Sequence, residues 1–291
     1  MIIKKFVFFI FLCFTICNAQ YYSTNLPDKI KFYVFPKKPI AGQLTVIKFY
    51  NLNIDNQYRL SILSSSKKNY PIYEIDKFTT VLVGIPLDAK KFIVYKFYKN
   101  EKLIKKGRIA ISNKKYPQTF LKVSKKYSKP EKSLWRRIKK EQKKLEKARS
   151  FFSPMRFWGD NLIPPVPIKR ISSPFGVARI FNGKVKSRHL GVDLPNPIGT
   201  PVHSIYSGRV VSTGYFYYGG KTILIDHGLG VVSSYSHLSE IFVKPNDLVS
   251  AGEIIGEVGV TGRVTGPHLH WGMYVNTIPI DPISFWSNIH Y

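Results

Sequence analysis

Hydrophobic and polar positions alternate in short runs along the first part of the chain, and this pattern predicts β-strands. Every second side chain of a strand points to the same face, so alternation marks a half-buried strand. Short strands separated by turns are typical of a sandwich of two sheets. We therefore expect an N-terminal β-sandwich-like accessory domain at residues 20–115 that positions, binds or only shields its neighbour. The expected strands cover residues 30–35, 43–51, 58–63, 78–83, 91–98 and 103–112.

The segment 116–168 has a different pattern. Between Glu131 and Arg149 the chain is dense in Lys, Arg and Glu, while Leu134, Ile138 and Leu145 recur at helical spacing. This pattern predicts one amphipathic basic helix in a basic linker. Our preferred interpretation is that its apolar stripe packs on a neighbouring domain. The alternative is that the helix lies on an anionic membrane.

From residue 169 the chain returns to short alternating runs separated by glycine clusters. Glycines at such places favour tight turns or a close approach of the backbone to another group. The runs contain neither a long helical pattern nor a fixed repeat. We expect a C-terminal antiparallel β-sheet domain at residues 169–291, so that the whole fold is mainly β. The expected strands cover residues 200–206, 208–214, 221–226, 231–236, 253–259 and 268–275.

Residues 1–19 have the layout of a secretory signal peptide. Lys4 and Lys5 precede an apolar run that ends near Cys17, and Cys-Asn-Ala precedes Gln20. The run is too short to span a bilayer comfortably, although a retained anchor is the alternative. Both cysteines, Cys13 and Cys17, fall in this segment, so the mature chain has no thiol for a disulfide, a thiolate zinc site or a cysteine nucleophile. We expect an exported protein that is periplasmic, associated with the cell envelope, or secreted.

The formal net charge is +28, and such a surplus attracts polyanions. Inside a cell the first expected partner would be nucleic acid. For an exported chain, the available polyanions are those of the cell wall and envelope. We therefore expect an anionic wall or envelope surface as a partner and no nucleic acid, with merely solvated lysines as the alternative. The pattern does not determine the oligomeric state.

Two histidines provide the clearest chemical signal. His268 and His270 are two residues apart after a Gly-Pro turn and at the start of an alternating run, so both rings should face the same way. Each imidazole has a donor and an acceptor nitrogen to satisfy, and a shared metal is the simplest solution. His189 and Asp193, four residues apart and expected on one strand face, are the best further ligands. Two histidines and one carboxylate form a known catalytic zinc set with an open fourth position, which predicts one Zn²⁺ per chain and hydrolytic chemistry.

The remaining histidines differ in their neighbours. His203 has apolar neighbours and is expected in the core. His227, beside Asp226 in a glycine turn, is expected to form local hydrogen bonds, and His290 is expected to be solvated. His237 is expected near the reactive water, where an uncoordinated imidazole can accept or donate a proton.

Several motifs follow one another in a characteristic order: Ser-Pro-Phe-Gly at 173–176, His-Leu-Gly-Val-Asp at 189–193, Gly-Thr-Pro-Val at 199–202, Tyr-Ser-His-Leu at 235–238 and Gly-Pro-His-Leu-His at 266–270. Together they resemble the lysostaphin-type (LytM domain) zinc metallopeptidases, which cut peptidoglycan peptides. The resemblance extends over about residues 171–282. It implies that His189, Asp193 and His270 are the zinc ligands. It also implies that His237 and His268 activate water and steady the oxyanion, and it leaves open which of them is the base.

The resemblance implies an exported zinc metalloendopeptidase that hydrolyses peptidoglycan stem peptides or cross-links with water as the nucleophile. All five site positions are filled, which disfavours the alternative of a non-hydrolytic wall-binding scaffold or amidase activator. Some members have a tyrosine shortly before the first zinc histidine, but residues 171–188 contain none. Arg179, Arg188 or a backbone amide would then supply the oxyanion donor. The sequence does not specify which peptidoglycan bond is cut. It also leaves open whether the N-terminal domain or the segment 116–168 blocks the groove.

Overall fold

The structure is a computed structural model of the 291-residue chain. It describes residues 22–26, 30–52, 58–63, 67–70, 72–75, 78–112, 114–121, 132–159, 161–181 and 184–288. Over these residues the fold is mainly β, as predicted, with two α-helices and four sheets. The expected signal peptide and His290 lie outside the described residues. No described helix has the length and apolar character needed to cross a bilayer.

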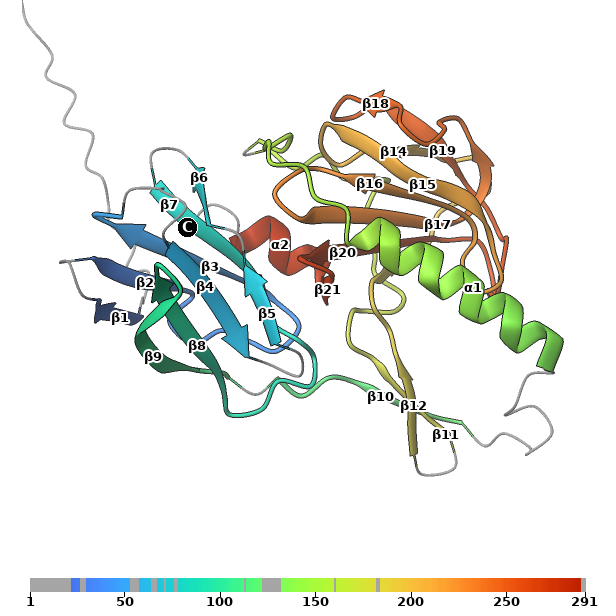
Figure 1. Ribbon diagram of the computed structural model, residues 1–291. Helices are drawn as coiled ribbons and strands as arrows, with labels where there is room; N and C mark the ends of the chain where they lie inside the picture. Colours follow the sequence, from blue (N-terminus) through green and yellow to red (C-terminus); the bar gives the residue numbers. More distant parts are fainter. Residues whose placement is uncertain are drawn as a thin grey trace, which may run out of the picture.

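The N-terminal part is a sandwich of two antiparallel sheets (Figure 1). Aromatic rings from the two sheets stack between them: Phe32 lies 4.9 Å from Tyr95 and Phe49 lies 5.2 Å from Phe97, measured between ring centroids. All four rings are buried, so they form the centre of this core. One sheet has the order β1 (Tyr22–Asn25), β2 (Lys31–Phe35), β3 (Leu44–Tyr50), β7 (Phe78–Gly84), β6 (Tyr73–Ile75), and the other has β5 (Lys67–Tyr70), β4 (Tyr58–Leu63), β8 (Phe92–Lys99), β9 (Lys102–Ala110).

The C-terminal part is built on one nine-stranded antiparallel sheet. Its longest strand, β17, pairs with β16, β20 and β19 and is buried over most of its length. Tyr235 on β17 and Trp271 on β20 are fully buried, so the core lies under these central strands. The strands are β13 (Val192–Leu194), β14 (Pro201–His203), β15 (Gly208–Phe216), β16 (Gly220–Asp226), β17 (Val231–Ile241), β18 (Leu248–Val249), β19 (Ile254–Val258), β20 (Leu269–Val275) and β21 (Ile278–Ile280).

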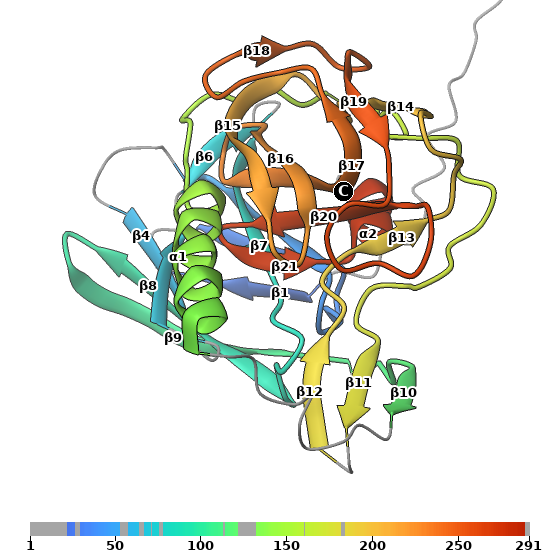
Figure 2. The same ribbon diagram turned by 90° about the vertical axis from the view of Figure 1, so that its right-hand side faces the viewer.

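The linker contains the predicted helix and a strand that was not predicted. Helix α1 (Lys132–Arg149) packs across β15 and β16, as our preferred interpretation of its pattern predicts (Figures 1 and 2). Its Ala148 is buried with Leu224 and Tyr274 of the sheet. The additional strand, β10 (Gln118–Leu121), pairs in parallel with β11 (Ala178–Phe181), which pairs in turn with β12 (Lys184–Arg188).

The two parts share a continuous hydrophobic core rather than a loose connection. Leu44, Val46 and Leu82 of the sandwich belong to the same buried cluster as the C-terminal sheet. The Asn276 side chain donates a hydrogen bond to the Leu82 carbonyl at 3.0 Å, next to β21 and helix α2 (Pro282–Asn288). This interface fixes the sandwich against one end of the C-terminal sheet (Figure 1).

Candidate metal centre and substrate groove

Strand register brings Asp193 and His270 together. In the antiparallel pair β13–β20, Asp193 stands directly opposite His270, and β17 places Ser236 on the other side of His270. Opposed residues of neighbouring strands have Cβ atoms about 5 Å apart, so a carboxylate and an imidazole can meet without distortion. Two segments separated by 77 residues thus supply two adjacent donor atoms.

His189 lies beside the same two side chains, but it is not part of a strand. The expectation that His189 and Asp193 share a strand face is wrong, because β13 begins at Val192 and His189 precedes it. Backbone hydrogen bonds with Gly176 and Val177 hold His189 in place. The chain then turns at Gly191, where a Cβ atom would lie 2.8 Å from the Nε2 atom of His270. The absent side chain at Gly191 leaves room for that ring.

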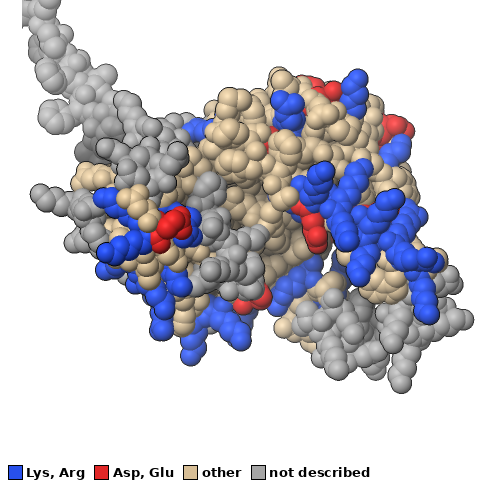
Figure 3. Space-filling view, viewed as in Figure 1, with Lys and Arg blue, Asp and Glu red and all other residues tan. Residues whose placement is uncertain are grey.

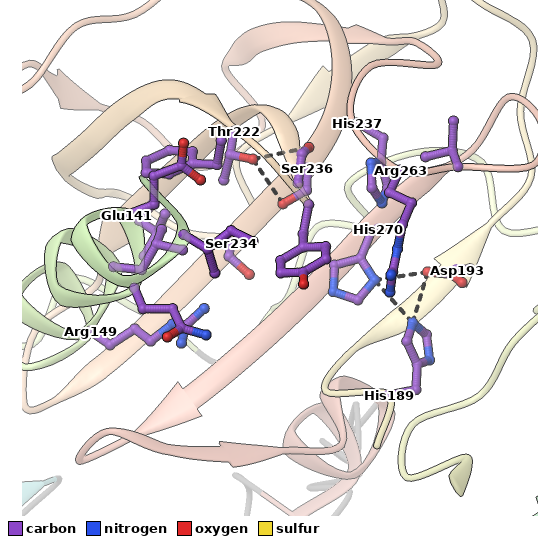
Figure 4. Close-up of a pocket in the computed structure, with 18 of the residues that line it drawn as sticks. Glu141, Arg149, His189, Asp193, Thr222, Ser234, Ser236, His237, Arg263 and His270 are labelled. Atoms are coloured by element: carbon purple, nitrogen blue, oxygen red, sulfur yellow. Dashed lines mark hydrogen bonds and ion pairs between the residues drawn. The ribbon is translucent and has the colours of Figure 1, made fainter. Parts of the chain in front are cut away.

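Three donor atoms form a compact triangle at this point (Figure 4). The Oδ1 atom of Asp193 lies 2.9 Å from His189 Nε2 and 2.8 Å from His270 Nδ1, and the two nitrogens lie 3.0 Å apart. Among the described residues, these three side chains form the group whose donor atoms could share one metal ion. The structure therefore brings together the three residues that were predicted as ligands.

The protonation states of these residues suit metal binding. Burial raises the pKa of Asp193, but hydrogen bonds from His189 and His270, together with their charges, outweigh it and hold this pKa well below its usual range. Burial lowers the pKa of His270, and the adjacent Asp193 carboxylate only partly offsets this effect. A metal requires an ionised carboxylate and neutral imidazoles. His189 also contacts the Pro174 carbonyl through Nδ1 at 2.9 Å, which orients its Nε2 toward the centre.

His237 and His268 lie beside the triangle with their rings 4.9 Å apart between centroids. The Nδ1 atom of His237 lies 2.9 Å from the Thr261 carbonyl oxygen, and that of His268 lies 2.8 Å from the Gly266 carbonyl oxygen. Each Nδ1 therefore donates, and each Nε2 is left as an acceptor. Burial lowers the pKa of His237 to about 4, so this ring is neutral at pH 7.

The other described histidines lie outside the metal group. His203, which was expected in the core, is only partly buried, and its Nδ1 donates to the Gly252 carbonyl oxygen at 2.8 Å. His227 is fully buried and makes local hydrogen bonds, as predicted, with the Ser207 carbonyl at 2.8 Å and the Ser233 hydroxyl at 2.7 Å.

The metal centre opens into a cavity of about 830 Å³. One wall is helix α1, part of the segment 116–168 whose relation to the groove the sequence left open. Another wall includes Phe216 and Tyr218 of the β15–β16 hairpin. Within the described residues, the N-terminal sandwich contributes no side chain to this lining. Of the two arginines predicted as oxyanion donors, Arg179 lines the cavity, whereas Arg188 donates to the Gly176 carbonyl. The α1 residues that line the cavity are Ile138, Glu141, Gln142, Leu145, Glu146 and Arg149.

A central antiparallel sheet with a His-Asp-His cluster in a groove is the arrangement of a metallopeptidase domain. Residues 187–282 match peptidase family M23, so this part of the chain is an M23 (LytM-type) peptidase domain. This bears out the lysostaphin-type resemblance. Peptidoglycan DD-endopeptidase ShyA of Vibrio cholerae is 44% identical over 119 residues, which are 40% of this chain and 28% of ShyA. DD-carboxypeptidase/endopeptidase Mpg of Neisseria meningitidis is 40% identical over 122 residues, 42% of this chain and 28% of Mpg.

A solved structure extends the likeness to most of the chain. The crystal structure of a putative peptidase M23 from Pseudomonas aeruginosa superposes with a TM-score of 0.65 at 27% identity, covering 86% of this chain and 95% of that one. The curated relatives, by contrast, are matched over less than a third of their own length.

Proposed function

We propose that this protein is a zinc-dependent endopeptidase that hydrolyses peptide bonds of peptidoglycan stem peptides or cross-links. The observation that supports it best is the approach of His189 Nε2, Asp193 Oδ1 and His270 Nδ1 to within 3.0 Å of one another in a groove. ShyA is named a peptidoglycan DD-endopeptidase and Mpg a DD-carboxypeptidase/endopeptidase, which supports this reaction class. Because this chain matches only part of each relative, its own activity is our proposal.

The donor set fits zinc. Two imidazole nitrogens and one carboxylate oxygen are the ligands of catalytic zinc sites with three protein ligands, and the pKa shifts of Asp193 and His270 favour the protonation states that a metal requires. Zinc held by His189, Asp193 and His270 would supply Lewis acidity, which activates water and polarises a carbonyl. The protein would hold one such ion.

His237 and His268 would move the protons. Each ring has its Nδ1 engaged with a backbone carbonyl, so Nε2 is the atom that accepts a proton from water and returns it to the leaving amine. General acid–base catalysis of this kind contributes about 10²–10⁴-fold to a rate. Either ring can act as the base. Arg179, which lines the groove, is the better candidate to stabilise the oxyanion in place of the absent tyrosine.

We also propose that the protein is exported and works at an anionic envelope surface. The signal-like residues 1–19 support export. Exposed lysines and arginines on the outer face of α1 support the proposed contact with an anionic surface (Figure 3). A helix that packs its apolar stripe on a sheet leaves its basic face to solvent, where each cation near an anionic lipid surface is worth about 1 kcal/mol.

Digestion of purified peptidoglycan tests the proposed reaction. We expect the protein to release soluble peptides with a new amine and a new carboxyl end, identified by mass spectrometry. His268→Ala should lower the rate by about 100-fold or more, because one proton-transfer group is lost, while the zinc content is retained. Absence of soluble products from the zinc-loaded protein would refute the proposal, and full activity of His268→Ala would refute the role of that ring.

A further inference from the structure

Three arginines line the groove without any charged or hydrogen-bonding partner. Arg149 comes from α1, Arg179 from β11 and Arg263 from the segment between β19 and β20. Among the described residues, none of the three guanidinium groups has an acceptor, and the Nε atom of Arg149 is buried as well. By contrast, Arg137 on the same helix is paired with Glu141 at 2.7 Å. Unpaired cations thus gather in the groove.

Aromatic rings hold two of these arginines in place. The guanidinium carbon of Arg149 lies 4.5 Å from the ring centroid of Tyr274, and that of Arg263 lies 4.6 Å from the ring centroid of Tyr218. Cation–π contacts of this kind orient a guanidinium group but satisfy none of its N–H donors. The Arg149 guanidinium is partly buried without an acceptor, which costs free energy that an anionic ligand would recover. Arg263 is exposed, and its ring contact holds its donors ready for such a ligand.

The acidic residues of the groove do not neutralise these cations. Asp193 is engaged by the metal-site histidines. Glu141 accepts hydrogen bonds from the Arg137 side chain and from the Tyr217 backbone N–H, both at 2.7 Å. Glu146 is exposed. With Asp193 and Glu141 engaged by these partners, Glu146 is the one remaining carboxylate in the lining to face the three arginines.

We propose that Arg149 and Arg263 bind free carboxylates of the substrate, so that the groove selects acidic peptides over uncharged ones such as a glycine bridge. This inference rests on the proposed function and names its substrate class. The planar guanidinium fork matches a carboxylate through two parallel hydrogen bonds. Arg149 projects from α1, on the opposite side of the groove from His189 and Asp193, so it contacts substrate away from the scissile bond (Figure 4).

This subsite extends beyond the segment that matches the family. Helix α1 (Lys132–Arg149) lies outside residues 187–282, and it forms a wall of the groove through its packing on β15 and β16. Peptides that share the scissile bond can therefore be distinguished by this additional wall. The expected ligand is a peptide with at least two free carboxylates, as in directly cross-linked stem peptides.

Paired substrates test the inference. Two synthetic cross-linked peptides of identical sequence, one with free carboxylates and one with carboxamides, are assayed for kcat and KM with the zinc-loaded full protein. We expect amidation to raise KM by about tenfold or more, because charge-assisted hydrogen bonds are lost, with little change in kcat. In Arg149→Gln and Arg263→Gln the ratio of the two KM values should be smaller than in the wild type. Arg136→Gln, an exposed residue of the same helix that does not line the groove, should keep it.

The outcomes separate this inference from the proposed function. Equal KM values for the two peptides, or undiminished discrimination in both groove variants, would overturn the inference and leave the peptidase activity standing. If the protein hydrolyses neither peptide, the proposed function fails, and calorimetric binding of the same two peptides still decides the subsite. Tighter binding of the acidic peptide that depends on Arg149 and Arg263 would support it, and equal binding would overturn it.

Discussion

The backbone of His237 is strained in a way that can be measured. Its φ angle is +68°, in the left-handed region that costs a residue other than glycine about 1–2 kcal/mol. His237 lies at the point where β17 changes its pairing partner. The residue before it, Ser236, pairs with His270 of β20, and the residue after it, Leu238, pairs with Val258 of β19. The His237 N–H donates to the Gly219 carbonyl at 2.8 Å, which holds this geometry. We infer that the strain is retained because it aims the imidazole at the metal centre.

Two variants isolate the strain from the loss of the ring. His237→Ala and His237→Gly both remove the imidazole, but only alanine keeps the Cβ atom that is disfavoured at this φ. Glycine recovers about 1–2 kcal/mol of strain and loses about 0.5–1 kcal/mol through its greater freedom in the unfolded chain. We therefore expect His237→Gly to be more stable than His237→Ala by about 1 kcal/mol. In a domain of this size that difference corresponds to about 3–5 °C in Tm.

Thermal unfolding and a hydrolysis assay check both halves of this prediction. Both variants should be inactive, while the glycine variant melts at the higher temperature. His203, on β14 and without a positive φ, provides the matched control: there the glycine variant should be the less stable of the pair. Equal melting temperatures for the two His237 variants would refute the inferred backbone strain. A glycine variant more stable than the alanine variant at both His237 and His203 would refute it as well. Turnover in His237→Gly would refute the role of the ring.

Two further predictions concern the support of the site and its core. Gly191→Ala would place a Cβ atom 2.5 Å from the Trp271 carbonyl oxygen and 2.8 Å from the His270 ring. We therefore expect the unfolding free energy to fall by about 1–3 kcal/mol and zinc to bind more weakly in a metal titration. Unchanged zinc affinity would contradict this prediction. Burial lowers the pKa of His227 to about 4. The stability that its neutral form provides is complete above pH 6.5 and is lost as the pH falls toward 4, by about 2 kcal/mol at pH 5. Denaturant unfolding at pH 7 and pH 5 should show this loss in the wild type and a smaller one in His227→Gln, and equal losses would argue against it.

The sequence predicted the longer strands because alternation over five or more residues identifies a half-buried strand. Residues 231–236 were expected as a strand, and β17 extends from Val231 to Ile241. Strands of two to four residues, such as β10 and β18, are too short to show a period. The parallel pairing of β10 with β11 also depends on contacts between residues about 60 positions apart, for which one sequence gives no signal.

For the site, the sequence predicted which side chains lie together, but not the backbone conformation that brings each of them there. The two-residue spacing of His268 and His270 fits the start of β20. The same logic failed for His189, because the turn at Gly191 replaces the expected strand. The pattern of α1 indicated an apolar stripe that packs, but it could not identify the partner. Its contribution to the groove therefore became visible only with the tertiary structure.

Zinc stoichiometry is the decisive measurement for the metal centre. Elemental analysis of the purified, zinc-loaded protein should give one ion per chain, and His189→Ala and Asp193→Asn should each lose it together with hydrolysis, because three ligands hold the ion. His268→Ala should keep one ion per chain while its turnover falls by about 100-fold or more. A wild-type protein that binds no zinc, or ligand variants that retain both the ion and full activity, would contradict the assignment of His189, Asp193 and His270 as its ligands.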